Sequence, residues 1–168
     1  MKEPFPKEEE REYTISMLVM NRFGLVSRVS GLISRRGYNI NSFIAEATMN
    51  PDIYRMVIKV NATETGVAQL TKQIAKLIDV IRVSNSLGAR YLERELILVK
   101  LKVPEGECDA FVRAANLPPR ASVVETKGDR TLVAFHGTPD EVQALVKTLE
   151  PFGVEDIVKS GVTAIRWE

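Results

Sequence analysis

Residues 13–40 have the sequence YTISMLVMNRFGLVSRVSGLISRRGYNI. Apolar and small polar side chains alternate from Tyr13 to Val19, which predicts a half-buried strand. Apolar residues then recur at helical spacing from Leu25 to Arg36, and Gly37 is placed to end this helix in a left-handed conformation. The stretch therefore predicts a strand, a loop at residues 21–24 and an amphipathic helix.

The same alternation of elements continues to residue 84. The sequence predicts a strand at Ile40–Met49, a turn at Asn50-Pro51-Asp52, a strand at Ile53–Val60, a helix capped by Thr63 or Thr65, and a strand at Val80–Ser84. The apolar stripe expected on the second helix consists of Val67, Leu70, Ile74, Leu77 and Ile78. The order is β-α-β-β-α-β.

This order repeats in the second half of the chain. The expected elements are a strand at Glu95–Val103, a short helix with Cys108, Phe111, Val112 and Ala115 on one face, a hairpin of Ala121–Glu125 and Arg130–His136, a helix, a strand at Val154–Ser160 and a terminal extension at Val162–Trp167. The second helix begins with a capping box at Thr138-Pro139-Asp140-Glu141 and should bury Val142, Leu145, Val146 and Leu149.

The predicted fold class is α+β, with two consecutive ferredoxin-like βαββαβ units, each a four-stranded antiparallel sheet with two helices on one face. We expect a flexible tail at residues 1–11, a first domain at 12–86, a linker at 87–94 and a second domain at 95–168. Because such small sheets have exposed edge strands, we also expect a homodimer.

Composition narrows the classes of function. The 168 residues are 45% hydrophobic and 27% charged, with a net charge of +1, so no large positive field favours nucleic acid or an anionic membrane. No apolar run reaches a membrane span, and the first residues do not resemble a secretory signal. One cysteine, Cys108, fits a reducing compartment, so we expect a cytoplasmic protein.

No pattern of catalytic residues stands out. His136 lies at a strand end without a nearby partner, and Cys108 lies on an apolar helix face, so both are interpreted as structural. One histidine and one cysteine are too few for most soft-metal sites. We found neither a phosphate-binding loop nor a nucleophile elbow, and we expect no catalytic residue and no metal.

The loop from Asn21 to Val26 is the candidate site. The first N–H groups of a helix lack intrahelical partners and carry the positive end of its dipole, and Gly24 would let a ligand carboxylate approach them. Asn21 could contact the same ligand, and Asn39 could do so from a second copy. In the alternative interpretation, Gly24 makes a tight turn and Asn21 caps the helix.

These residues resemble a known family. The runs Asn21-x-x-Gly24-Leu25-Val26-Ser27-Arg28-Val29 and Ser34-x-Arg36-Gly37-Tyr38-Asn39-Ile40 resemble the ACT domain of the acetolactate (acetohydroxyacid) synthase small regulatory subunit. The resemblance extends through Tyr54-Arg55-Met56, Asp79–Val83, Glu93–Lys100 and Lys159–Val162, and thus covers about residues 11–166.

The resemblance implies a non-catalytic subunit of the branched-chain amino-acid pathway. It would activate a large catalytic subunit that carries thiamine diphosphate, Mg²⁺ and FAD, and would confer feedback inhibition by a branched-chain amino acid, usually valine. The ACT domains would pair in a dimer and bind the effector at their seam. The resemblance places Asn21, Gly24, Leu25 and Val26 of one copy opposite Asn39 and Ile40 of the other.

Three alternatives remain at this point. An RNA-binding module of the same strand order would stack bases on aromatic residues, for which the central strands offer Phe43 and Tyr54. A small phosphatase would use Arg22 with Asn39 or Asn41. A stand-alone amino-acid-sensing ACT protein would regulate another target and would lack the second-half features.

Overall fold

The computed structural model describes residues 9–167, which form two compact units. The first contains the residues up to 92 together with 164–167, and the second contains residues 93–163. Each unit has a four-stranded sheet and two α-helices, which confirms the predicted fold class. Residues 1–8 of the expected tail lie outside the described residues.

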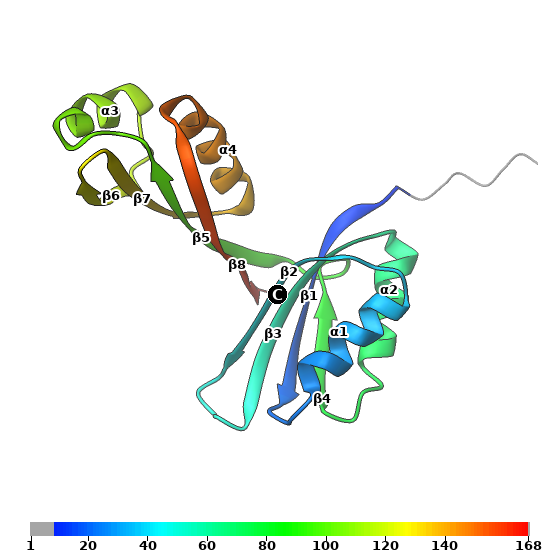
Figure 1. Ribbon diagram of the computed structural model, residues 1–168. Helices are drawn as coiled ribbons and strands as arrows, with labels where there is room; N and C mark the ends of the chain where they lie inside the picture. Colours follow the sequence, from blue (N-terminus) through cyan, green and yellow to red (C-terminus); the bar gives the residue numbers. More distant parts are fainter. Residues whose placement is uncertain (1–8, 168) are drawn as a thin grey trace, which may run out of the picture. The chain divides into compact units, whose positions relative to one another are not determined.

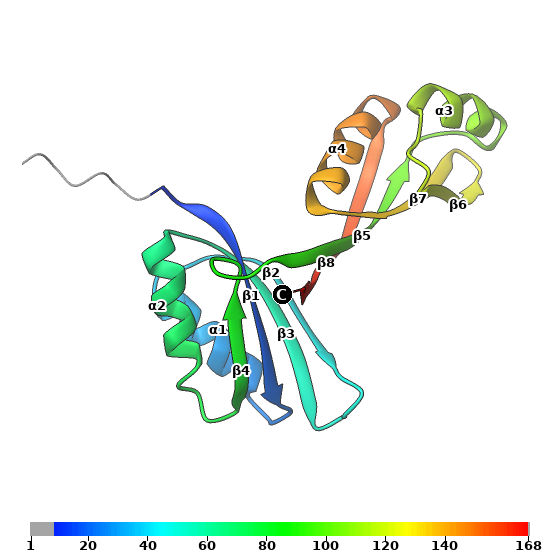
Figure 2. The same cartoon turned by 180° about the vertical axis from the view of Figure 1, so that it is seen from behind.

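The first unit has the strand order β2-β3-β1-β4, and the neighbouring strands are antiparallel. Figures 1 and 2 show that both of its helices cover the same face of the sheet. The elements are β1 (Arg11–Met20), α1 (Leu25–Arg35), β2 (Ile40–Ala47), β3 (Ile53–Ala62), α2 (Glu64–Ile74) and β4 (Val80–Asn85).

Side chains from both layers fill the space between this sheet and its helices. Ile15 and Ile58 of the central strands are completely buried, as are Val29 and Ile33 of α1 and Val67 of α2. Burying one such side chain contributes about 1.5–3 kcal/mol. The alternation predicted for residues 13–19 is therefore the inward face of β1.

Helix ends follow the predicted chemistry in most places. Gly37, which follows the C-cap residue Arg36 of α1, has φ of +80°. The Thr63 hydroxyl accepts a hydrogen bond of 3.0 Å from the Gly66 N–H at the start of α2. The expectation that Ile78 extends the buried stripe of α2 is wrong. Helix α2 ends at Ile74, so the helical spacing stops there and Ile78 is 96% exposed.

The second unit has the strand order β6-β7-β5-β8. Its elements are β5 (Tyr91–Leu101), η1 (Glu105–Glu107), α3 (Cys108–Ala115), β6 (Ala121–Lys127), β7 (Arg130–Gly137), α4 (Pro139–Leu149), η2 (Glu150–Phe152) and β8 (Val154–Arg166). Phe111 and Ala115 of α3 are buried as expected, whereas Val112 is 38% exposed because it turns away from the sheet on this short helix.

The capping box of α4 is confirmed. The Glu141 N–H donates to the Thr138 hydroxyl at 3.2 Å, and the Thr138 N–H donates to the Glu141 carboxylate at 2.7 Å. That backbone hydrogen bond, with a second from Arg120, holds the pKa of Glu141 below its ordinary value because both stabilise the charged carboxylate.

Two expected boundaries differ from the structure. Strand β5 begins at Tyr91, inside the expected linker 87–94, where the alternation of its side-chain burial starts, and the Tyr91 hydroxyl hydrogen-bonds to Ser84 at 2.6 Å. Strand β8 runs through Gly161 without a break, and residues 164–167 group with the first unit rather than with 95–163. The second difference reflects a contact between residues distant in sequence, since the Trp167 N–H donates to the Arg90 carbonyl at 2.9 Å.

The cap of α4 gives a stability prediction. Thr138→Ala should lower the free energy of unfolding by about 1 kcal/mol, because it leaves the Glu141 N–H without its acceptor. Thr148→Ala is the matched control, since its hydroxyl only adds a bond to the Ala144 carbonyl inside the same helix. Urea unfolding measures both, and equal losses would contradict the role assigned to Thr138.

Candidate effector-binding site

The loop between β1 and α1 has the geometry of a close-approach site. Gly24 has φ of +74° and ψ of 2°, which is the left-handed region that glycine favours, and it immediately precedes the first residue of α1. The Leu25 N–H donates to the Arg22 carbonyl at 3.2 Å. Val26 and Ser27 follow in the first helical turn, where N–H groups have no intrahelical acceptor.

Asn21 does not cap the helix, contrary to one of the two interpretations of the sequence. Gly24 occupies the cap position, and α1 has no side-chain cap. The Asn21 side-chain amide instead donates to the Pro51 carbonyl at 3.4 Å, and its backbone N–H donates to the Asp52 carbonyl at 2.8 Å. Asn21 thus connects the loop to the turn between β2 and β3.

The buried carboxylate of Asp79 holds the loop through contacts with arginines of the loop and of α1. Asp79 is 5% exposed, its carboxylate pairs with Arg28 of α1, and it lies 3.5 Å from the Arg22 guanidinium. Its carbonyl also accepts the Met20 N–H at 2.8 Å. We did not identify Asp79 as a site residue from the sequence. The signal available was a charged residue between Ile78 and Val80, at the start of a predicted strand.

The apolar residues of the loop divide into two groups. The Leu25 side chain is 3% exposed and belongs to the core, so this residue can offer a ligand its backbone only. Val26 is 48% exposed and Phe23 is fully exposed. Phe23 is a second residue that our sequence reasoning missed, although an aromatic residue beside a loop glycine was visible.

Asn39 and Ile40 lie at the other end of the sheet. Ile40 pairs with Val60, which pairs with Tyr13 near the start of β1, whereas the loop follows Met20 at its end. Seven residues of strand correspond to about 23 Å. One chain therefore does not bring Asn39 and Ile40 together with residues 21–26, and a shared site requires a second copy.

Arg22 and Asn41 of the phosphatase alternative, and Phe43 and Tyr54 of the RNA-binding alternative, are engaged elsewhere. Arg22 pairs with Asp79, and the Asn41 amide donates to Glu12 and Asn61 at 3.0 Å each. Phe43 and Tyr54 pack against the core under the helices rather than on the open face of the sheet.

Within residues 9–167, no three side chains of histidine, cysteine, aspartate or glutamate gather in a way that could hold a metal ion. The helices of that same range are also all too short or too polar to cross a membrane.

Comparison with known proteins decides the family. The family model described as the AHAS small subunit-like ACT domain matches residues 15–82, and the model of the small subunit of acetolactate synthase matches residues 94–168. The acetolactate synthase small subunit of Mycobacterium leprae is 40% identical over 91% of this chain and 90% of its own length. The chain belongs to the acetolactate synthase small-subunit family.

Two further members of this family agree. The small subunit of Mycolicibacterium smegmatis is 37% identical over 91% of this chain and 89% of its own length. The crystal structure of the acetolactate synthase small subunit from Thermotoga maritima matches with a TM-score of 0.78 and 29% identity, over 94% of this chain and 99% of that one. The family resemblance and the non-catalytic, regulatory character that it implied are thereby confirmed.

Asp79 should be essential for the structure of this loop. Asp79→Asn removes the charge that Arg22 and Arg28 share, and should lower the free energy of unfolding by about 1–3 kcal/mol, since both arginines are partly exposed. Asp52→Asn, at an exposed turn position, is the control and should change it by less than about 0.5 kcal/mol. Chemical unfolding of both variants measures the difference, and an unchanged Asp79→Asn stability would contradict the assignment.

Proposed function

We propose that the first units of two copies bind valine, or a related branched-chain amino acid, at their seam, and that this inhibits a catalytic subunit which the chain otherwise activates. The observation that carries the proposal is Gly24 at φ +74° at the N-terminus of α1. No side chain accepts a hydrogen bond from the N–H groups at this helix end, so a ligand carboxylate can bind the N–H groups of the first turn, beside the Arg28 guanidinium.

The surroundings of the loop suit the rest of an amino acid. Val26 offers an exposed apolar surface for an aliphatic side chain, and the neighbouring Phe23 adds more. The Asn21 side chain lies at the start of the loop, where its carbonyl oxygen can accept from an ammonium group. Leu25 contributes through its backbone, because its side chain is buried.

An edge strand of the first sheet is available for pairing with a second copy. β2 is an edge strand, and two copies of it can pair about a twofold axis in antiparallel fashion. Such pairing places the start of one β2, with Asn39 and Ile40, beside the end of the other, which lies at the same end of its sheet as the loop of residues 21–26. Asn39 is exposed and can then complete the site.

The partner enzyme is the large subunit of acetolactate synthase, which joins two pyruvates, or pyruvate and 2-oxobutyrate. Relatives over most of the chain are named as its small subunit, which supports this choice. Thiamine diphosphate, Mg²⁺ and FAD would belong to the catalytic subunit. Effector binding would inhibit by favouring one state of the complex over the other. A cytoplasmic location likewise stays a prediction.

A charge at position 24 should abolish inhibition. In Gly24→Asp, the new carboxylate would lie beside the helix N-terminus and within reach of Arg28, so it would repel the carboxylate of valine and take its place. We expect the reconstituted enzyme to stay activated and to need more than about tenfold more valine for half inhibition.

Gly24→Asn is the matched control for that variant. Asparagine has nearly the same volume, tolerates positive φ and adds no charge. Valine titration of the reconstituted enzyme with each variant distinguishes charge from backbone strain. Full valine sensitivity in Gly24→Asp would refute the site assignment.

Mixed dimers test whether the site is shared. Gly24→Asp and Asn39→Ala should each abolish valine binding in homodimers. In a mixed dimer, both changes fall in the same seam site and the second site is intact. Refolding the two variants together should therefore restore about a quarter of the wild-type number of sites, because about half of the dimers are mixed and each has one good site.

Calorimetric titration with valine counts those sites. A site built within one chain would stay inactive in every dimer, so the absence of any restored binding would contradict the seam. Two copies of one variant refolded together provide the baseline.

A further inference from the structure

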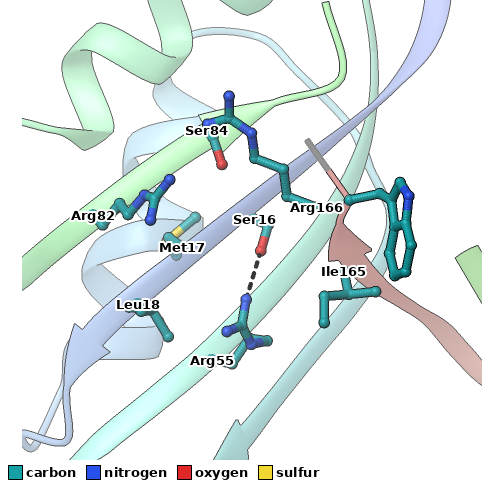
Figure 3. Close-up of a pocket in the computed structure, with 9 residues that line it drawn as sticks. Ser16, Met17, Leu18, Arg55, Arg82, Ser84, Ile165 and Arg166 are labelled. Atoms are coloured by element: carbon teal, nitrogen blue, oxygen red, sulfur yellow. Dashed lines mark hydrogen bonds between the residues drawn. The ribbon is translucent and has the colours of Figure 1, made fainter. Parts of the chain in front are cut away.

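The open face of the first sheet, opposite α1 and α2, carries a cleft of about 530 Å³. Figure 3 shows Arg55, Arg82 and Arg166 around this hollow, with Ser16 and Ser84 between them. They come from β3, β4, the end of β8, β1 and β4, respectively. None of the residues 21–26, 39 or 40 lines this cleft, so it is separate from the proposed effector site.

Strand register places two of the arginines in one row. Leu18 of β1 pairs with Arg55 of β3 on one side and with Arg82 of β4 on the other. Their Cα atoms are therefore about two strand spacings, or about 10 Å, apart on the same face. Two long guanidinium side chains at that separation can converge on one ligand above Leu18.

Among the described residues, no carboxylate forms an ion pair with the two arginines of this row. The residues that line the cleft include no aspartate or glutamate. Glu46 faces Arg55 across the β2–β3 pair, but neither Arg55 nor Arg82 forms an ion pair with any residue in the range 9–167. By contrast, Arg22, Arg28, Arg120 and Arg130 all pair with carboxylates.

The rest of the lining combines hydroxyl groups with apolar surface. Ser16 is 4% exposed, and its hydroxyl lies 3.5 Å from the Arg55 guanidinium. Ser84 adds a second hydroxyl directly opposite Ser16 in the β1–β4 register. Leu18, Ile165 and Trp167 supply apolar walls.

We propose that this cleft binds a small organic anion with at least two negative charges, either a phosphate ester or a polycarboxylate. Guanidinium groups bind both kinds of oxyanion through paired hydrogen bonds, and the serine hydroxyls can donate to further oxygens. A neutral zwitterion such as valine would leave one arginine uncompensated. The volume lies within the usual range for small-ligand sites, and the apolar walls suit a ligand with a carbon skeleton.

Trp167 makes the proposal measurable, because it lines the cleft and is the one tryptophan of the chain. We would titrate the full-length protein with pyrophosphate and with citrate at constant ionic strength and follow tryptophan fluorescence. At least one should give a saturable change, and their comparison distinguishes phosphate from carboxylate. Arg55→Gln and Arg82→Gln should each weaken that binding about tenfold or more.

Arg113→Gln is the matched control, because it removes the same charge from an exposed position on α3 of the second unit. It should leave the affinity unchanged. Far-ultraviolet circular dichroism and an unchanged unfolding midpoint would show that the Arg55 and Arg82 variants are folded, without reference to valine.

Three results would overturn the proposal. The first is the absence of saturable binding of both anions. The second is an equal weakening of anion binding in Arg113→Gln. The third is that neither anion binds the wild type while the Arg55 and Arg82 variants lose their association with the catalytic subunit. The last result would assign the arginines to an acidic surface of a protein partner.

Discussion

The carboxylate of Asp79 is the constraint on which the shape of the candidate site depends. It lies buried at the start of β4, pairs with Arg28 of α1 and Arg22 of the loop, and its backbone carbonyl accepts the Met20 N–H. The end of β1, the loop and α1 thereby meet the start of β4, which is distant from all three in sequence. Because a buried carboxylate without partners is costly, the two arginines are held in place, and the loop presents the Gly24 backbone outward.

In the first unit, the residues that fill the core differ from the residues that the candidate site would offer to a ligand. The side chains of Ile15, Ile33 and Leu70 fill the core, whereas the loop above Asp79 contributes backbone N–H groups and exposed apolar atoms. Asn39 and Ile40, which are expected to complete the site, lie at the opposite end of the same sheet. A site that includes both groups of residues would need a second copy, and the edge strand β2 offers a surface for its pairing.

Much of the fold could be predicted because local chemistry specifies it. Gly37 and Thr138 mark helix ends through their own conformations and hydrogen bonds, and alternation marks β1. The miss at Ile78 arose because α2 is shorter than its apolar pattern suggested, whereas Val112 lies within α3 and turns away from the sheet. The Asp79 pairings and the row of Arg55 and Arg82 could not be predicted, because they depend on strand register between distant segments.

The central claim is that this chain controls an acetolactate synthase catalytic subunit in response to a branched-chain amino acid. The most direct measurement is the turnover of the cognate catalytic subunit with and without this protein, titrated with valine, leucine and isoleucine. The account predicts that the protein raises turnover and that valine, or one of its two relatives, lowers it again only when the protein is present. Turnover that neither the protein nor any of the three amino acids changes would contradict the account.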